Sequence, residues 1–165
     1  MTRNKFSVLI SSDKIDNPNS GLGRVACDFN DALIEASPSE MDLSFLVTNK
    51  PKEGILVNQR TEILNLWKRY FASYLKKYDL FHASYQGPSY KIKGAKKTVL
   101  TIHDLNFLFT KSEKKQKKYL KRIQSNVNDA DAIVFISNFT HETCINQLHI
   151  PSDKIIRIFY KWNIF

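Results

Sequence analysis

The sequence predicts an α/β fold: a doubly wound, Rossmann-like parallel sheet with helices on both faces. Short apolar runs of strand length recur along the chain, and segments with helical spacing of apolar residues separate them. Each run is almost continuously apolar, which is typical of strands that are buried on both faces. Strands that alternate with helices pair in parallel, and right-handed crossovers then predict about six strands in one sheet.

The first half of the chain supplies three strands and two helices. The strands are expected at residues 5–11, 41–48 and 78–84. Residues 23–36 predict an amphipathic helix, because apolar positions recur there at helical spacing: Leu22, Val25, Phe29, Leu33 and Ala36. Residues 60–77 predict a second helix from the same kind of spacing, at Ile63, Trp67, Tyr70, Phe71, Tyr74 and Tyr78.

The second half of the chain supplies three more strands, expected at residues 97–103, 131–137 and 153–159. A basic amphipathic helix is predicted at 113–128 and another helix at 138–149. Asp129 and Asp131 precede a strand, and ligands bind at the opposite, carboxyl ends of parallel strands. This Asp pair is therefore interpreted as a helix end and a strand start, not as a metal site.

The composition indicates one globular domain. Of the 165 residues, 42% are apolar, and the domain is expected at residues 1–160 with a short tail at 161–165. Cys27 and Cys144 are interpreted as reduced, buried residues. No residues have metal-ligand spacing, so neither a metal nor another bound cofactor is expected. No apolar run is long enough for a signal peptide or a membrane span, so a cytoplasmic location is expected.

The stretch GLGRVA, which begins at Gly21, matches the G-x-G-x-x-A pattern of dinucleotide sites. It starts about nine residues after the first strand, and the second strand ends in LVTNK without an acidic residue, so NAD binding is disfavoured. Gly21 and Gly23 would instead leave backbone N–H groups free for an anion, with the Arg24 guanidinium beside them. The alternative is a plain glycine turn with Arg24 in solvent.

Polar residues also stand at three other strand ends. His103, which Asp104 follows, could orient a sugar hydroxyl or, when protonated, donate to a phosphate. The alternative is a histidine that bonds to the loop backbone. Ser137 is expected to cap the next helix and to add a polar contact to the same cleft. His82 is interpreted as structural, because no acidic residue flanks it closely.

Three stretches, in this order, resemble the N-terminal half of GT-B glycosyltransferases, specifically glycosyltransferase family four. NSGLGRVACDFNDAL resembles the glycine loop and first helix of that family, and KKTVLTIHDLNFL resembles its His-Asp strand end. NDADAIVFISNFTHETCINQLHIPSDKIIRIFY resembles its signature of Ala-Asp, strand, Ser, helix, Ile-Pro and Lys-Ile strand. Together the three stretches and the segments between them cover most of the chain.

The resemblance implies a retaining enzyme that transfers a sugar from a nucleotide-sugar donor to a saccharide or lipid-linked acceptor without a bound metal. By position, His103 would be the catalytic residue that touches the transferring sugar. The family often has Ser-Glu where this chain has Ser137 and Asn138, so a carboxylate contact there is in doubt. The residues expected to bind substrate are Gly21, Gly23, Arg24, Asp104 and Ser137.

The resemblance also implies two Rossmann-like domains that face each other across a cleft, of which this chain is similar to the acceptor-side one. The donor-binding domain would follow after residue 160 and is not part of these 165 residues. We therefore expect this chain alone to transfer no sugar, and a separate donor domain is one expected partner. The competing hypothesis is a non-catalytic binding or assembly module that meets its partner through apolar C-terminal residues: Ile158, Phe159, Trp162, Ile164 and Phe165.

The net charge of +9 is concentrated in one segment. Residues 91–122 hold eleven Lys and Arg against two Asp and Glu, whereas the rest of the chain is balanced. Lys111–Arg122 is open to three interpretations: a solvated helix face, peripheral contact with the anionic inner face of a membrane, or a nucleic-acid site. Nucleic acid is disfavoured, because aromatic residues are not interleaved with these lysines in a stacking pattern.

Overall fold

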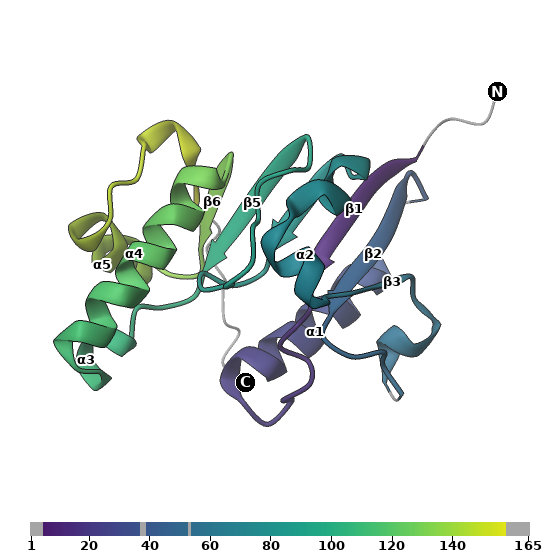
Figure 1. Ribbon diagram of the computed structural model, residues 1–165, viewed down its shortest axis with the longest axis horizontal. Coiled ribbons are helices and arrows are strands. Elements are labelled where there is room, and N and C mark those ends of the chain that lie inside the picture. The colour runs from purple at the N-terminus through teal and green to yellow at the C-terminus, as the bar shows by residue number, and fades with distance from the viewer. Residues whose placement is uncertain (1–4, 37–38, 53, 158–165) are drawn as a thin grey trace.

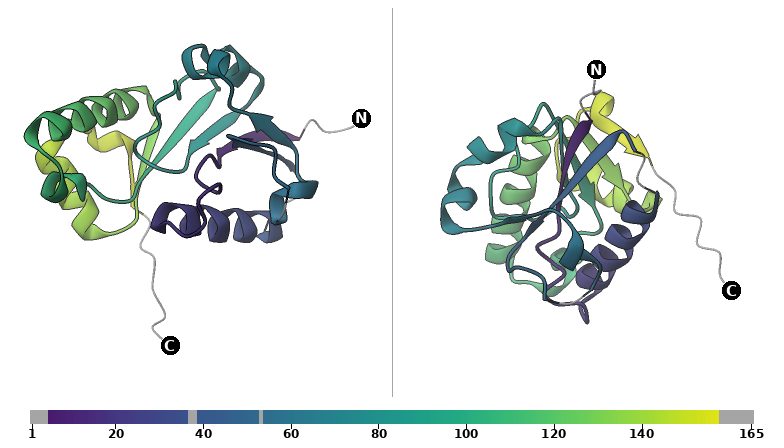
Figure 2. Two further views of the ribbon diagram at one scale, coloured as in Figure 1. Left: turned by 60° about the horizontal axis from the view of Figure 1, so that its bottom comes forward. Right: turned by 90° about the vertical axis from the view of Figure 1, so that its right-hand side faces the viewer.

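The computed structural model describes residues 5–36, 39–52 and 54–157, and these form one sheet with helices on both faces (Figures 1 and 2). The order across the sheet is β3-β2-β1-β4-β5-β6-β7, and every neighbouring pair is parallel. The predicted fold class is therefore confirmed. The strands are β1 (Phe6–Ser11), β2 (Met41–Val47), β3 (Thr61–Ile63), β4 (Leu80–Ala83), β5 (Lys97–Ile102), β6 (Ala132–Phe135) and β7 (Ile155–Arg157).

The helices are distributed unequally over the two faces of the sheet. Helix α1 packs on one face, while α2, α4 and α5 lie on the other (Figure 2). The α-helices in the described part of the chain are α1 (Gly21–Ala36), α2 (Leu66–Tyr70), α3 (Phe107–Thr110), α4 (Glu113–Asp129) and α5 (Asn138–Gln147). The described residues also form three 3-10 turns: η1 (Ile55–Asn58), η2 (Ala72–Lys77) and η3 (Ser152–Lys154). None of the helices in the described ranges is long and apolar enough to span a bilayer.

The core has one part on each side of the sheet. The smaller part lies beneath α1 and is formed by Val8, Ile10, Phe45, Val47 and Leu56. The larger part lies beneath α4, α5 and η2, and its fully buried members include Leu9, Leu46, Phe81, Leu100 and Ile133. Neighbouring residues of β1 thus face opposite sides, which explains why the strands read as continuously apolar runs.

Residues 60–77 do not form the single helix that their aromatic spacing predicts. They contain β3, the five-residue helix α2 and the turn η2, so the sheet has seven strands where six were expected. Trp67, Tyr70 and Phe71 are 64%, 73% and 49% exposed. Asn65 causes the break, because its side chain accepts a hydrogen bond from the backbone N–H of Lys68 and starts a new helix.

Three further expectations concern Asp131, the two cysteines and the C-terminal residues. Asp131 accepts a hydrogen bond from the backbone N–H of Thr98, near the amino end of β5, so it lies away from the carboxyl edge as expected. Both cysteines are free, but only Cys144 is buried and Cys27 is half-buried. The expected tail and the apolar C-terminal residues lie outside the described residues.

The topology places one crevice at the carboxyl edge of the sheet. The chain runs from β1 outward to β2 and β3, then returns to β4 on the other side of β1. In open parallel sheets, ligands bind at the carboxyl ends of the two strands where the order reverses. The residues after β1 and β4, together with those after β5, are therefore the first place to look for a site.

Candidate functional site

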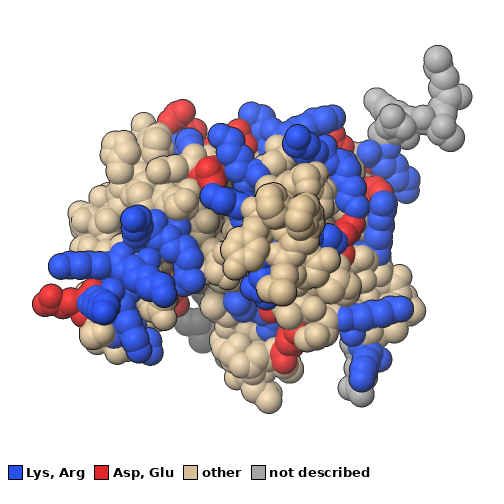
Figure 3. Space-filling model, viewed as in Figure 1, with Lys and Arg blue, Asp and Glu red and all other residues tan. Residues whose placement is uncertain are grey.

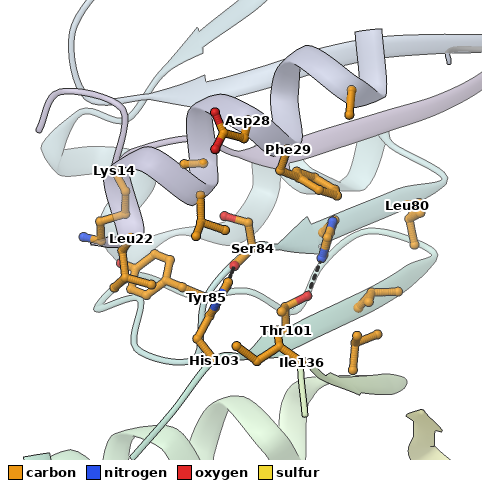
Figure 4. A pocket seen from close by; sticks show the side chains of 16 residues that line it. Lys14, Leu22, Asp28, Phe29, Leu80, Ser84, Tyr85, Thr101, His103 and Ile136 are labelled. Carbon is orange, nitrogen blue, oxygen red and sulfur yellow. Dashed lines mark hydrogen bonds between the residues drawn. The ribbon is translucent and has the colours of Figure 1, made fainter. Parts of the chain in front are cut away.

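A pocket of about 510 Å³ lies between α1 and the part of the sheet formed by β4, β5 and β6 (Figure 4). Its walls are mostly apolar, with Leu22, Val25 and Phe29 from α1 facing Val99 and Val134 from the sheet. Four of its polar residues lie at the carboxyl edge of the sheet: Lys14, Ser84, Tyr85 and His103. Asp28, His82 and Thr101 also line it. The pocket forms because α1 covers β1 and β2 closely but covers the neighbouring strands only in part.

His103 is the first residue after β5, and it is buried at the polar end of the pocket. Its ring Nε2 lies 2.8 Å from the carbonyl oxygen of Ser84. A carbonyl oxygen only accepts hydrogen bonds, so Nε2 carries the hydrogen. Within the described residues Nδ1 has no hydrogen-bond partner, and in the neutral ring it can accept a hydrogen bond from a ligand. His103 thus combines the loop-bonding role and a position in the pocket.

A chain of hydrogen bonds fixes the strand ends around His103. Ser84 donates its backbone N–H to Ser11 Oγ at 2.8 Å and its hydroxyl to the Ser11 carbonyl at 2.6 Å, which joins β4 to β1. Thr140 Oγ1 donates to the carbonyl oxygen of His103 at 2.8 Å. Ser137 Oγ in turn accepts the backbone N–H of Thr140 at 3.1 Å. The ends of β1, β4 and β5 and the start of α5 therefore form one bonded edge.

His82 adds a second imidazole to the pocket. It lies on β4, where its Nε2 is 2.8 Å from Thr101 Oγ1 and its ring meets Phe29 edge-on at 5.3 Å (Figure 4 shows the bond to Thr101). Burial, with a smaller contribution from the charge of His103, lowers the pKa of His82 from 6.5 to about 4. His82 is thus neutral near pH 7. The sequence predicted only a structural role for His82 and did not indicate that it lines the pocket.

A polar cluster at the carboxyl ends of β1 and β4 was not predicted. The carboxylate of Asp13 accepts hydrogen bonds from the hydroxyls of Tyr85 at 3.1 Å and Tyr90 at 3.0 Å. Lys14 pairs with Asp13 at 3.3 Å and lies 4.4 Å from the centre of the Tyr85 ring. Burial and the charge of Asp13 raise the pKa of Tyr85 and of Tyr90, so both hydroxyls stay protonated donors. The runs SSDK and SYQGPSY carry this signal, but only the pairing of β1 with β4 brings them together.

The glycine loop is built differently from the predicted anion cradle. The N–H of Gly23 is not free, because it donates to Ser20 Oγ at 3.0 Å. A Cβ on Gly23 would lie 1.8 Å from the Asn17 carbonyl oxygen, whereas one on Gly21 would meet nothing within 4 Å. Arg24 is exposed and pairs with Asp28 at 3.1 Å. Neither glycine nor Arg24 lines the pocket, and their role in substrate binding stays a prediction.

The two remaining predicted residues lie beside the pocket without lining it. Asp104 Oδ1 accepts the backbone N–H of Asn106 at 3.0 Å, which closes the turn after β5. Ser137 caps α5 as predicted, and its polar contact with a ligand stays a prediction. The described residues contain no group of three His, Cys, Asp or Glu that could hold a metal ion. The side chains at the polar end of the pocket offer hydrogen bonding from His103 and the ammonium group of Lys14, which pairs with Asp13, beside an apolar surface.

Comparison with known families shows to which of them the chain belongs. The model of Glycosyltransferase Family 4 matches residues 25–159. The chain belongs to glycosyltransferase family 4. The family match runs from α1 to β7 and so includes His103, Asp104 and Ser137, whereas the glycine loop lies just before it. No curated protein sequence matches the chain significantly.

Membership of glycosyltransferase family 4 indicates the general function of the chain. The resemblance predicted from three stretches of sequence is confirmed, and a transferase acting on sugars is the function that the family supports. The polar end of the pocket stands where ligands bind in a sheet of this topology, at the carboxyl ends of the strands, while its apolar part extends over the sheet to Leu80 and Val99.

Proposed function

We propose that this domain is the acceptor-side half of a retaining glycosyltransferase that moves a sugar from a nucleotide-sugar to a saccharide or lipid-linked acceptor, without a bound metal. The position of His103 carries the proposal. The chain belongs to family 4, and the imidazole of His103 is held in one orientation at the polar end of the pocket, beside the carboxyl edge of the sheet.

The lining of the pocket suits such a substrate. The free Nδ1 of His103 accepts a sugar hydroxyl, and the ring cannot turn away because its Nε2 is bonded to Ser84. The ammonium group of Lys14, which pairs with Asp13, is a hydrogen-bond donor at the same end. The apolar walls fit the C–H face of a sugar ring or the hydrocarbon part of a lipid-linked acceptor.

A second domain is needed to complete the site. Val25, which lines the pocket, is 43% exposed, so water reaches the place where the sugar would react. Stabilising a leaving nucleoside diphosphate requires donors from both sides of a water-excluding cleft. A donor-binding domain facing this edge would supply them, and residues 1–165 alone are expected to transfer no sugar.

The test is ligand binding to residues 1–165 by saturation-transfer NMR. Methyl glycosides, UDP-glucose and NADH are the probes, and His103→Gln is compared with the unaltered chain, because the glutamine amide can still donate to Ser84. We expect the unaltered chain to give glycoside signals that are weaker in His103→Gln. We expect no turnover of UDP-glucose. Signals from NADH alone would instead indicate an oxidoreductase. If none of the probes gave signals, a binding or assembly module would be favoured. Turnover of UDP-glucose would refute the need for a second domain.

A further inference from the structure

We propose that the surface formed by helices α2 and α4 docks this domain onto an anionic membrane surface. Two groups of residues carry the inference. The aromatic patch consists of Leu66, Trp67, Tyr70 and Phe71, and the basic face consists of Lys114, Lys115, Lys117, Lys118 and Lys121.

The aromatic patch is a group of large apolar side chains that the fold turns outward. Leu66 is 75% exposed, and Trp67 and Tyr70 are 64% and 73% exposed. The rings of Trp67 and Phe71 stack on each other with centroids 4.1 Å apart. A contiguous group of this kind on a domain surface marks an interaction site, whereas scattered exposed residues do not.

The aromatic patch is also held in place. Asn65 caps α2 through the N–H of Lys68, and the ammonium group of Lys68 turns inward to Glu62. Burial alone would raise the pKa of Glu62, but hydrogen bonds from Lys68 and then Lys77 lower it to about 2. The cap and these ion pairs fix the inner side of α2, so its aromatic residues are presented on a firm support.

The basic face lies on α4, the helix with most of the excess charge. Its five lysines are all exposed, while Ile123 and Val127 on the opposite side of the helix are buried in the core. Among the described residues, none of the five lysines lies within ion-pair distance of a carboxylate. Their charge is therefore free to act on a partner.

The aromatic patch and the basic face lie on the same side of the molecule. Helices α2 and α4 both lie on the face of the sheet that is turned to the viewer in Figure 1, and the second view in Figure 2 agrees. Figure 3 shows the blue side chains of α4 at the left and an uncharged surface over α2 at the centre. Because α2 follows β3, and α3 and α4 follow β5, this surface borders the carboxyl edge that holds the pocket.

The chemistry of the surface favours a lipid bilayer over a protein partner. Tryptophan and tyrosine are enriched at the level of lipid headgroups, where one end of the side chain is apolar and the other is wet. Lysines beside them are attracted to anionic headgroups. Phe109 on α3, next to α4, is 74% exposed and adds an apolar side chain beside the basic face. Docked in this way, the domain would present its pocket close to a lipid-linked acceptor.

The experiment uses the fluorescence of Trp67. The chain has two tryptophans, so a Trp162→Phe background leaves Trp67 as the only one. The protein is mixed with vesicles of phosphatidylcholine alone or with about 30% phosphatidylglycerol added, at low and high salt. We expect a blue shift of Trp67 emission and cosedimentation with the anionic vesicles only, both reversed by salt. No sugar or nucleotide is present, so the outcome is independent of the proposed transferase function.

Matched variants separate the surface from general charge. The triple change Lys114→Gln, Lys117→Gln and Lys118→Gln should weaken binding about a hundredfold, since each lysine near an anionic surface contributes about fivefold and the three factors multiply. The control removes three exposed lysines elsewhere: Lys5, Lys50 and Lys52. It should change binding less than about twofold. Circular dichroism checks that both variants fold.

Three outcomes would overturn the proposal. The first is cosedimentation with anionic vesicles while the emission of Trp67 stays unchanged, which means adsorption by charge without insertion of the aromatic patch. The second is an equal loss of binding in the control triple variant. The third is no vesicle binding together with concentration-dependent dimers that Trp67→Ser abolishes, which assigns the patch to a protein contact.

Discussion

The Nε2 atom of His103 lies 2.8 Å from the carbonyl oxygen of Ser84, so the first residue after β5 is bonded to the first residue after β4. This hydrogen bond crosses the carboxyl edge of the sheet at the polar end of the pocket. It fixes the orientation of the imidazole and leaves Nδ1 for a ligand. The proposed site depends on this orientation more than on any other single contact.

Replacing His103 separates its structural role from its role in binding. His103→Ala leaves the buried Ser84 carbonyl without its donor and opens a cavity, which should lower the free energy of unfolding by about 2–3 kcal/mol. His103→Gln, whose amide can donate to Ser84, should lower it by about 1 kcal/mol or less. Urea unfolding of both variants measures the difference. Equal losses would mean that the hydrogen bond to Ser84 contributes little.

Gly21 and Gly23, in the first turn of α1, should respond oppositely to alanine. Gly23→Ala places a Cβ 1.8 Å from the Asn17 carbonyl oxygen, so the loop must shift, at a cost of roughly 2–3 kcal/mol. Gly21→Ala meets nothing within 4 Å and should stabilise α1 by about 0.4–1 kcal/mol. Denaturation midpoints of the pair test this. A well-tolerated Gly23→Ala would show that the loop does not close on α1 as described.

His82 should make stability depend on pH between about 4 and 6.5. Burial lowers its pKa to about 4 in the folded state, whereas the unfolded chain binds the proton near 6.5. The unfolded state therefore binds more protons in this window, so stability falls as the pH falls through it, by about 3 kcal/mol in total. His82→Gln should remove most of this slope in urea unfolding at a series of pH values. A slope that persists in the variant must come from another group.

Glu62 should act in a separate, more acidic window. Hydrogen bonds from Lys68 and Lys77 outweigh burial and lower its pKa from 4.5 to about 2. The ion-paired carboxylate thus stabilises the fold above about pH 4.5, and this contribution disappears as the pH falls towards 2. Glu62→Gln should flatten the stability profile below pH 4.5 and leave the His82 window unchanged. A change in the higher window instead would show that the two groups are coupled.

The position of His103 could be predicted because it depends on local sequence. An apolar run that ends in a polar residue marks a strand end, and parallel strands bring such ends to one edge. The partners of Asp13 could not be predicted in this way. Tyr85 and Tyr90 are 72 and 77 residues from it in sequence, and only the placement of β4 beside β1 joins them. Strand order is a tertiary property that the periodicity of the sequence does not contain.

The misassigned segment 60–77 shows a different limit of sequence reasoning. Its aromatic residues satisfy helical spacing, but spacing does not distinguish a buried face from an exposed one. Trp67 and Tyr70 follow the Asn65 cap on a short helix that turns them outward. Gly23 is a related case. The pattern correctly predicts the start of a helix, but the N–H of Gly23, which was expected to bind an anion, donates to Ser20 Oγ.

The most direct test of the proposed site is an NMR titration of the chain labelled with ¹⁵N at histidine. The chain has four histidines, of which His82 and His103 line the pocket while His141 and His149 do not, so the protein carries its own control. Titration with methyl glycosides should shift the ring signals of His103, and to a lesser extent those of His82, and leave the other two unchanged. Ring signals of His103 that stay fixed while a glycoside demonstrably binds would contradict a sugar-binding role for this pocket.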